Sequence, residues 1–269
     1  MSSVAVIQMC SGAEVAANLR RAERLIARAA AAGASLVVLP ENFACMPGKA
    51  ADRRRAAEDD GAGPIQDFLA ASAAWHGLWI VGGSVPIRMK QGKFASAVMV
   101  YDANGHRRAR YDKLHLFDVG VPGRRESYRE SRYFVAGRKP VAVETPLGRM
   151  GLAVCYDLRF PELFRRLALH EGCTFFAVPS AFTATTGRAH WQLLLRARAV
   201  ENQCFVLAAA QSGKHADGRE THGESLIVGP WGETLAALKR RPGIACAELD
   251  RAAQTRLRRR FPVLDHARL

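Results

Sequence analysis

Residues 150–162 read Met-Gly-Leu-Ala-Val-Cys-Tyr-Asp-Leu-Arg-Phe-Pro-Glu, an apolar run that changes abruptly into a polar segment. The apolar part, residues 150–154, is typical of a buried strand. Pro161 suits the first turn of the helix that we predict over residues 161–170. Cys155 lies between these two elements. Functional side chains of α/β proteins gather at the carboxyl ends of strands, so this turn would present the thiol at such an edge.

The chain on the amino-terminal side of this stretch alternates between apolar strands and helical patterns. The patterns predict helices over residues 14–32 and 64–75 and strands over residues 4–9, 35–39 and 78–82. This alternation is typical of parallel β-α-β units. The turn sequence Asp102-Ala-Asn-Gly105 separates strands predicted over 94–101 and 106–111, which indicates an antiparallel hairpin. The sheets should therefore be mixed.

The carboxyl-terminal side continues the pattern after an irregular stretch. Residues 117–140 have no steady period and contain several Gly and Pro residues, so we expect a long ordered loop that lines a site. Beyond it we predict helices over residues 161–170 and 190–201, and strands over residues 141–144, 150–154, 174–178, 204–210, 226–228, 233–238 and 244–249. There is no repeat or linker, so we expect one α/β domain over residues 1–269.

Composition excludes several classes of protein. The 269 residues carry a net charge of +14 and are 49% hydrophobic, a balance typical of a globular chain with a large core. The sequence shows neither a signal peptide nor a membrane span, so we expect a soluble, cytoplasmic protein. Six scattered cysteines favour reduced thiols over a zinc site or a disulfide scaffold. The arginine clusters, such as Arg53–Arg55, lack a nucleic-acid-binding motif and are interpreted as solvated surface.

Three polar residues follow predicted strands directly: Glu41, Lys113 and Cys155. A cysteine there can be the nucleophile of acyl transfer, but a free thiol with a pKa near 8.5 needs an activator. Glu41 can serve as general base. Lys113 can favour the thiolate and stabilise the oxyanion of a tetrahedral intermediate. Taken singly, each residue also has a structural explanation, as a packed thiol or a member of an ion pair.

Together the motifs around these residues resemble those of the nitrilase superfamily. They read Leu-Pro-Glu-Asn-Phe at 39–43, Tyr-Asp-Lys-Leu-His-Leu-Phe-Asp at 111–118 and Gly-Leu-Ala-Val-Cys-Tyr-Asp-Leu-Arg-Phe-Pro-Glu at 151–162. The resemblance implies a four-layer α-β-β-α sandwich in one domain, which pairs into a homodimer or a higher homo-oligomer. It also implies that Glu41 is the base, Lys113 the electrostatic partner and Cys155 the nucleophile.

The family also carries a second glutamate in the loop after the lysine. Here both Glu126 and Glu130 precede a serine, and Glu130 fits better because Phe134 and Gly137 follow it at the family's spacing. The resemblance implies that this glutamate orients Lys113 and the substrate amide. Neither a cofactor nor a metal is implied, and the histidines, including His115, His215 and His222, are assigned to hydrogen bonding because they lack metal-ligand spacing.

Segments further along the chain resemble the deaminated glutathione amidase branch of this family. They are Pro-Ser-Ala-Phe at 179–182, residues 189–199, Ala-Ala-Ala-Gln at 208–211 and Gly-Pro-Trp-Gly at 229–232. The implied reaction cleaves a linear, non-peptide amide, deaminated glutathione, into 2-oxoglutarate and cysteinylglycine. We expect Tyr156, Arg159, Phe182 and His190 to bind this anionic substrate, with Arg188 or Arg196 as a further carboxylate partner, although each arginine can equally form a structural salt bridge.

Alternatives remain open at this point. The related ω-amidases share most of these segments and would release ammonia from 2-oxoglutaramate. Hydrolysis of another small amide, a carbamoyl compound or a nitrile is a further possibility. An alternative of a different class is a catalytically inactive protein that binds nucleic acid through its basic surface. Retention of the three catalytic-type residues argues against that last possibility. His222-Gly-Glu-Ser departs from the aromatic-Gly-His-Ser of many relatives.

Overall fold

Two mixed β-sheets form the centre of the molecule in the computed structural model, which describes residues 3–120 and 127–268. In spatial order the first sheet contains β17 (Gly243–Glu248), β1 (Ser3–Gln8), β2 (Ala34–Val38), β3 (Trp79–Val81), β5 (Phe94–Tyr101) and β4 (Val85–Arg88), and β6 (Arg107–Asp112) pairs with β5. The second contains β16 (Thr234–Ala237), β15 (Leu226–Val228), β12 (Phe205–Ala208), β11 (Phe175–Ala177), β10 (Gly148–Leu152) and β9 (Ala142–Thr145).

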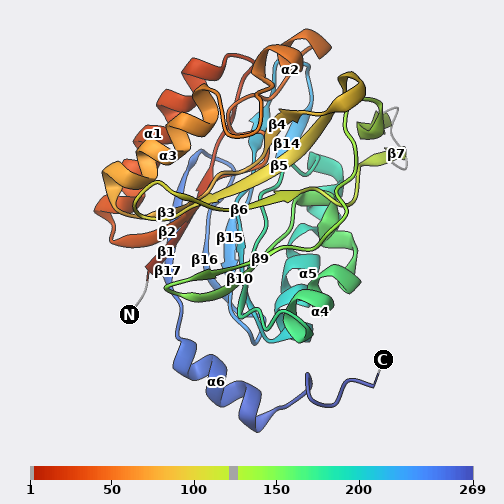
Figure 1. Ribbon diagram of the computed structural model, residues 1–269. Coiled ribbons are helices and arrows are strands. Elements are labelled where there is room, and N and C mark those ends of the chain that lie inside the picture. The colour runs from red at the N-terminus through yellow and green to blue at the C-terminus, as the bar shows by residue number, and fades with distance from the viewer. Residues whose placement is uncertain (1–2, 121–126, 269) are drawn as a thin grey trace.

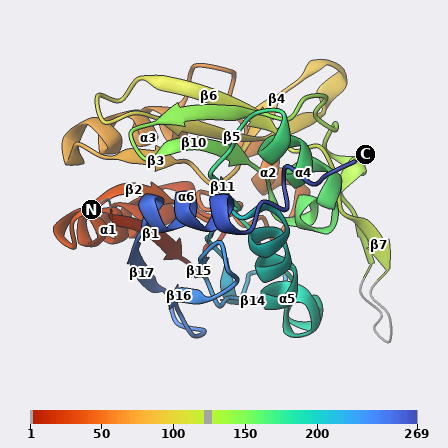
Figure 2. The ribbon, with the colours of Figure 1, turned by 90° about the horizontal axis from the view of Figure 1, so that it is seen from below.

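Helices cover the outer face of each sheet. Figure 1 shows α1 (Val15–Ala31) and α3 (Pro64–His76) on one side and α4 (Pro161–Leu169) and α5 (Ala184–Asn202) on the other, with the sheets between them. Figures 1 and 2 place α6 (Arg251–Arg260) at the end of the molecule away from α2 (Ala50–Ala56). This arrangement is the predicted four-layer α-β-β-α sandwich. Within the described ranges no helix is long and apolar enough to cross a membrane.

Strand β1 shows why the central strands are continuous apolar runs. Val4 and Val6 belong to the core between the two sheets, whereas Ala5 and Ile7 belong to the core beneath α1 and α3. All four side chains are fully buried. A strand covered on both faces needs apolar residues at every position, because successive side chains point to opposite faces.

The predicted hairpin is confirmed, since β5 and β6 pair antiparallel around the turn at residues 102–105. The predicted loop over 117–140 was only partly right. It contains β7 (Asp118–Gly120) paired with β8 (Ser127–Arg129), followed by a 3-10 turn, η2 (Glu130–Arg132). A second short hairpin joins β13 (Ser212–Lys214) to β14 (Glu220–His222). A further 3-10 turn, η1, spans Lys90–Gly92.

Candidate active site

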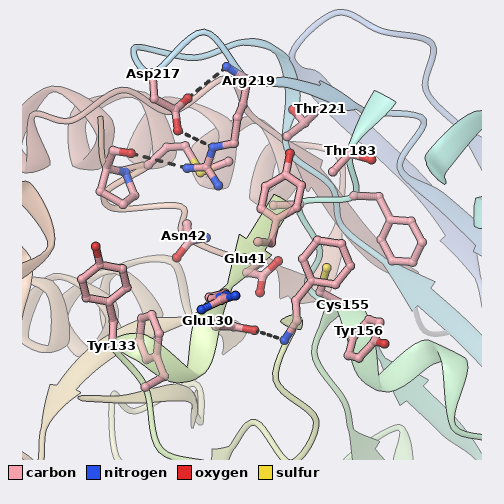
Figure 3. A pocket seen from close by; sticks show the side chains of 18 of the residues that line it. Glu41, Asn42, Glu130, Tyr133, Cys155, Tyr156, Thr183, Asp217, Arg219 and Thr221 are labelled. Carbon is pink, nitrogen blue, oxygen red and sulfur yellow. Dashed lines mark hydrogen bonds and ion pairs between the residues drawn. The ribbon is translucent and has the colours of Figure 1, made fainter. Parts of the chain in front are cut away.

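The sandwich brings Glu41, Lys113 and Cys155 together from the two sheets. Glu41 and Lys113 follow β2 and β6 of the first sheet, and Cys155 follows β10 of the second. Lys113 Nζ donates to Glu41 Oε1 over 2.9 Å, and the Glu41 carboxylate is close enough to the Cys155 thiol to raise the pKa of that thiol. All three are at least nine-tenths buried. Figure 3 shows Glu41, Glu130 and Cys155 pointing into one cavity.

Glu130, in η2, completes this group, as predicted from the loop sequence. Its two carboxylate oxygens lie 3.0 and 2.9 Å from Lys113 Nζ. Glu130 Oε2 also accepts a 2.7 Å hydrogen bond from the backbone amide of Phe117, which fixes the carboxylate at the base of the β7–β8 hairpin. The other candidate, Glu126, lies outside the described residues.

Lys113 is a buried cation held by two carboxylates. Burial alone lowers the pKa of a lysine, but the carboxylates of Glu130 and Glu41 outweigh it, so the pKa of Lys113 is raised well above its ordinary value. Its ammonium group is therefore charged at neutral pH. A charge with so little contact with water is tolerated because all of its hydrogen bonds go to charged acceptors.

Cys155 sits at a strained turn where the strand ends and η3 (Cys155–Arg159) begins. Its φ is +48°, in the left-handed region that residues other than glycine seldom adopt, and its amide donates to Pro179 O over 2.9 Å. Burial and the Glu41 carboxylate raise the pKa of the Cys155 thiol well above its ordinary value, although Lys113 and the Ala181 amide oppose them. Lys113 thus favours the thiolate, as expected, but burial and the Glu41 carboxylate outweigh its effect on the pKa of Cys155.

Asp157 fastens this turn to the first sheet, a role the sequence did not reveal. One carboxylate oxygen accepts from the Tyr111 hydroxyl at 2.7 Å and the Val154 amide at 2.8 Å. The other accepts from the His115 amide at 3.0 Å and lies 2.7 Å from His115 Nδ1. Because Tyr111 belongs to β6 and Lys113 follows it, the same contacts set the nucleophile and the lysine relative to each other.

A cavity of about 370 Å³ opens above these residues, at the small end of the usual range for small-molecule sites. Three of the predicted substrate-binding residues, Tyr156, Arg159 and Phe182, line it. Arg159 lies 5.3 Å from the Phe182 ring centroid and 5.9 Å from that of Tyr156. Across residues 3–120 and 127–268, no carboxylate forms an ion pair with Arg159.

The helix predicted over residues 190–201 begins earlier in the structure, because α5 starts at Ala184. Thr183 and Thr186, at the start of the helix, line the cavity, whereas His190 is exposed and contacts Arg159 Nη1 at 3.2 Å without lining it. Arg188 and Arg196 are also exposed and do not line the cavity, and Arg196 donates to Gly232 O. These two arginines are therefore poorly placed to hold a substrate carboxylate.

Most residues of the cavity rim were not predicted from the sequence. Its cationic members are Lys49, Arg53, Arg129 and Arg219, and its other polar members include Asn42, Tyr133, Asp217 and Thr221. Arg53 was expected to be solvated surface and instead faces the cavity. No group of three or more His, Cys, Asp or Glu side chains in the described parts of the chain has the arrangement of a metal site.

The sequence profile of the carbon-nitrogen hydrolase family matches residues 3–259. The chain belongs to the carbon-nitrogen hydrolase family. The deaminated glutathione amidase of Yersinia enterocolitica is 39% identical over 269 residues, which cover 99% of this chain and 93% of that protein. This family is the nitrilase superfamily predicted from the motifs, and its members are hydrolases of carbon–nitrogen bonds.

Solved structures of this family share the fold. The NitFhit protein of Caenorhabditis elegans superposes with a TM-score of 0.91 at 36% identity, covering 99% of this chain, and the chain spans 65% of that fusion protein. An amidase from Nesterenkonia sp. AN1, crystallised with acrylamide added at its active-site cysteine, gives a TM-score of 0.79 at 27% identity, covering 95% of this chain and 98% of that one. These similarities confirm the predicted single-domain nitrilase fold.

Proposed function

We propose that this carbon-nitrogen hydrolase is an amidase that cleaves deaminated glutathione into 2-oxoglutarate and cysteinylglycine. The observation that carries the proposal is that the Cys155 thiol, the Glu41 carboxylate and the Lys113 cation meet in a cavity lined by several arginines. The similarity to a deaminated glutathione amidase along almost the whole chain supports the choice of substrate. That substrate is an anion, which suits a protein with a net charge of +14.

The first half of the reaction forms a thioester. Glu41 accepts the thiol proton as Cys155 Sγ attacks the amide carbon, and the carbonyl oxygen becomes an oxyanion beside the Lys113 ammonium group. The tetrahedral intermediate then collapses. The carbon–nitrogen bond breaks, and Glu41 returns the proton to the departing nitrogen, which leaves as the free amine of cysteinylglycine.

The second half consumes one water molecule. Glu41 takes a proton from the water as its oxygen attacks the thioester carbon, and Lys113 again faces the oxyanion. The carbon–sulfur bond then breaks, the thiolate recovers the proton from Glu41, and 2-oxoglutarate leaves. Glu130 stays outside the proton transfers in this scheme. Its two bonds hold the ammonium group at a fixed distance from Glu41 and Cys155.

The acyl end of the substrate is assigned to Arg159. This residue comes from η3, the same turn as Cys155, and its guanidinium lies over the cavity-lining rings of Tyr156 and Phe182. A carboxylate with an adjacent oxo group can accept two parallel hydrogen bonds from a guanidinium. The chain thus offers an anchor for the 2-oxo acid close to the nucleophile.

The experiment that tests this function is a substrate panel in which both products are assayed. Deaminated glutathione should be cleaved with a higher kcat/KM than 2-oxoglutaramate, and both should exceed short neutral amides and nitriles. Release of cysteinylglycine distinguishes the proposed reaction from ω-amidase action, which releases ammonia. If a neutral amide or a carbamoyl compound is preferred tenfold or more, the proposed substrate is wrong, although the hydrolase family still holds.

We also propose that the chain forms a homodimer through an apolar surface on α5. Leu193 and Val200 are 67% and 47% exposed on that helix, and Trp231 and Phe261 are exposed aromatic residues whose ring centroids lie 5.7 Å apart. Gly232, which follows Trp231 in the chain, lies beside Val200. Large exposed apolar patches mark interaction surfaces. Light scattering should show a dimer, and Leu193→Lys with Val200→Lys should give a monomer. A wild-type protein that is monomeric at high concentration contradicts the proposal.

A further inference from the structure

Arg53 differs from its two arginine neighbours on α2. Arg54 and Arg55 are exposed, and Arg55 pairs with Glu14 and Asp52. Arg53 instead lines the cavity. The helix therefore directs one of three consecutive arginines into the cavity. Partial burial of a cation there costs free energy unless an anion binds it.

The surroundings of Arg53 supply aromatic faces and another cation. Its guanidinium carbon lies 4.5 Å from the Tyr133 ring centroid and 5.3 Å from that of Phe134. Burial and the neighbouring Arg219 cation lower the pKa of Arg53, although it stays charged at neutral pH. Asp217 pairs with Arg219 rather than with Arg53. In the parts of the chain that the structure describes, Arg53 forms neither an ion pair nor a hydrogen bond through its side chain.

Arg53 and Arg159 approach the nucleophile from different sides. Figure 3 shows Tyr133 and Tyr156 on opposite sides of Cys155 and Glu41. Arg53 lies over Tyr133, and Arg159 lies near Tyr156. The cavity therefore carries a cation on each side of the thiol, and each cation is free of an ion-pair partner among the described residues.

We propose that Arg53 is a specificity-determining residue that binds the carboxylate of the leaving group. This inference rests on the proposed function, because deaminated glutathione carries its scissile amide between two carboxylates. The 2-oxo acid carboxylate is joined to the scissile carbon by the shorter chain, which suits Arg159 on the turn that bears Cys155. The glycine carboxylate is joined by the longer chain, which suits Arg53 on the far wall beside Tyr133.

The test compares two substrates that differ in one group. One is deaminated glutathione, and the other is the same compound with its glycine carboxylate converted to a carboxamide. Wild-type protein should prefer the acid, and Arg53→Met should reduce this preference, the ratio of the two kcat/KM values, by about ten- to a hundredfold. Arg53→Lys keeps the charge without the planar fork, so it should give an intermediate ratio. Because both substrates are measured on one preparation, incomplete folding of a variant cancels in the ratio.

Two control variants test whether the change in substrate preference is specific to Arg53. Arg54→Met removes the same charge from the neighbouring exposed position and should leave the ratio at its wild-type value. Arg159→Met should lower kcat/KM for both substrates by a similar factor, because both retain the 2-oxo acid. If Arg53→Met lowers both values equally, or if Arg159→Met abolishes the preference, the assignment of Arg53 is wrong. If wild-type protein releases no cysteinylglycine, the proposed function fails and this inference fails with it.

Discussion

The catalytic centre and the cavity rim are built in different ways. Glu41, Lys113 and Cys155 lie at strand ends and are almost wholly buried, and Lys113 hydrogen bonds to both Glu41 and Glu130. The rim is formed by α2, the β7–β8 hairpin with η2, and the β13–β14 hairpin. Its arginines are more exposed than the three catalytic residues, and they contact aromatic rings or nearby carboxylates. The ends of the strands in the two sheets therefore position the catalytic residues, while short connecting elements form the rim that we propose selects the substrate.

The centre is held by contacts that depend on one another. Lys113 has two carboxylate partners, and Asp157 links the nucleophile's turn to the strand that precedes Lys113. Removing one member of such a buried network leaves its partners with unpaired charge or unmet hydrogen bonds. Changes in the centre should therefore have large effects on rate or stability, and changes at the rim should shift substrate preference or pH response.

Loss of the nucleophile should have the largest effect. Cys155→Ala should reduce turnover below detection while leaving the circular dichroism spectrum unchanged, because it removes one sulfur atom from a turn held by other residues. Wild-type protein quenched during turnover should carry the 2-oxoglutaryl mass on the peptide that contains Cys155, as measured by mass spectrometry. An adduct on Cys45 or Cys173 contradicts the assignment.

Loss of the base should come next. Glu41→Gln should lower kcat by about 10²–10⁴-fold, the usual contribution of a positioned acid–base group. The same change removes a carboxylate that raises the pKa of Cys155, so that pKa should fall toward its ordinary value. Alkylation by iodoacetamide should accordingly rise at a lower pH than in wild-type protein. This opposite response of turnover and thiol reactivity separates a base from a merely structural residue.

A control keeps that experiment specific to the centre. Glu162→Gln makes the same chemical change at an exposed position at the start of α4 and should leave kcat within about twofold, since surface substitutions have small effects. Glu41→Gln protein that retains more than a tenth of wild-type activity would be too active for Glu41 to be the general base.

Loss of the hydrogen bonds to Asp157 should affect the stability of the fold more than the rate of the reaction. Asp157→Asn puts an amide group where four donor contacts now meet a carboxylate, so it should cost about 1–3 kcal/mol in the free energy of unfolding. Tyr111→Phe removes a single donor and should cost less. Urea unfolding measures both. Equal stability of Asp157→Asn and wild-type protein would mean that the turn at Cys155 is held without this carboxylate.

Much of the centre was predictable from sequence because strand ends leave a clear pattern. An apolar run followed by Glu41 or Cys155 places those side chains at the edge of a sheet, and the family motifs supply the pairing between sheets. Asp157 lies inside a family motif, but its partner Tyr111 is in β6 of the other sheet and His115 is in the loop that follows β6. Nothing local in the sequence indicates these contacts.

The rim was less predictable because it depends on elements without an apolar period. Residues 50–56 contain three successive arginines, so the inward direction of Arg53 follows from the packing of α2 and not from the pattern. The helix α5 begins with Thr183 as its cap, whose hydroxyl accepts from the Thr186 amide, in a polar segment that conceals the start. That earlier start places His190 inside the helix and not at its beginning.

The smallest predicted effect concerns His222, at the end of β14. His222 is buried against Gly187 in α5, it ion-pairs with Glu224 at 3.3 Å when protonated, and its Nδ1 has no hydrogen-bond partner within the described residues. Burial lowers the pKa of His222 from 6.5, and the Glu224 carboxylate opposes this without reversing it. The folded protein therefore resists protonating a residue that the unfolded chain protonates freely.

The sign of the pH effect follows from that difference. A histidine with a depressed pKa contributes stability that is present above pH 6.5 and lost as the pH falls below it. His222→Phe should therefore flatten the fall in Tm between about pH 7 and pH 5, where an unperturbed histidine titrates. The adjacent Thr221 lines the cavity, so acid should raise KM before it lowers kcat, and His222→Phe should reduce that rise. If Tm depends on pH identically in the variant and the wild-type protein, protonation of His222 does not affect the stability of the fold, and the prediction is wrong.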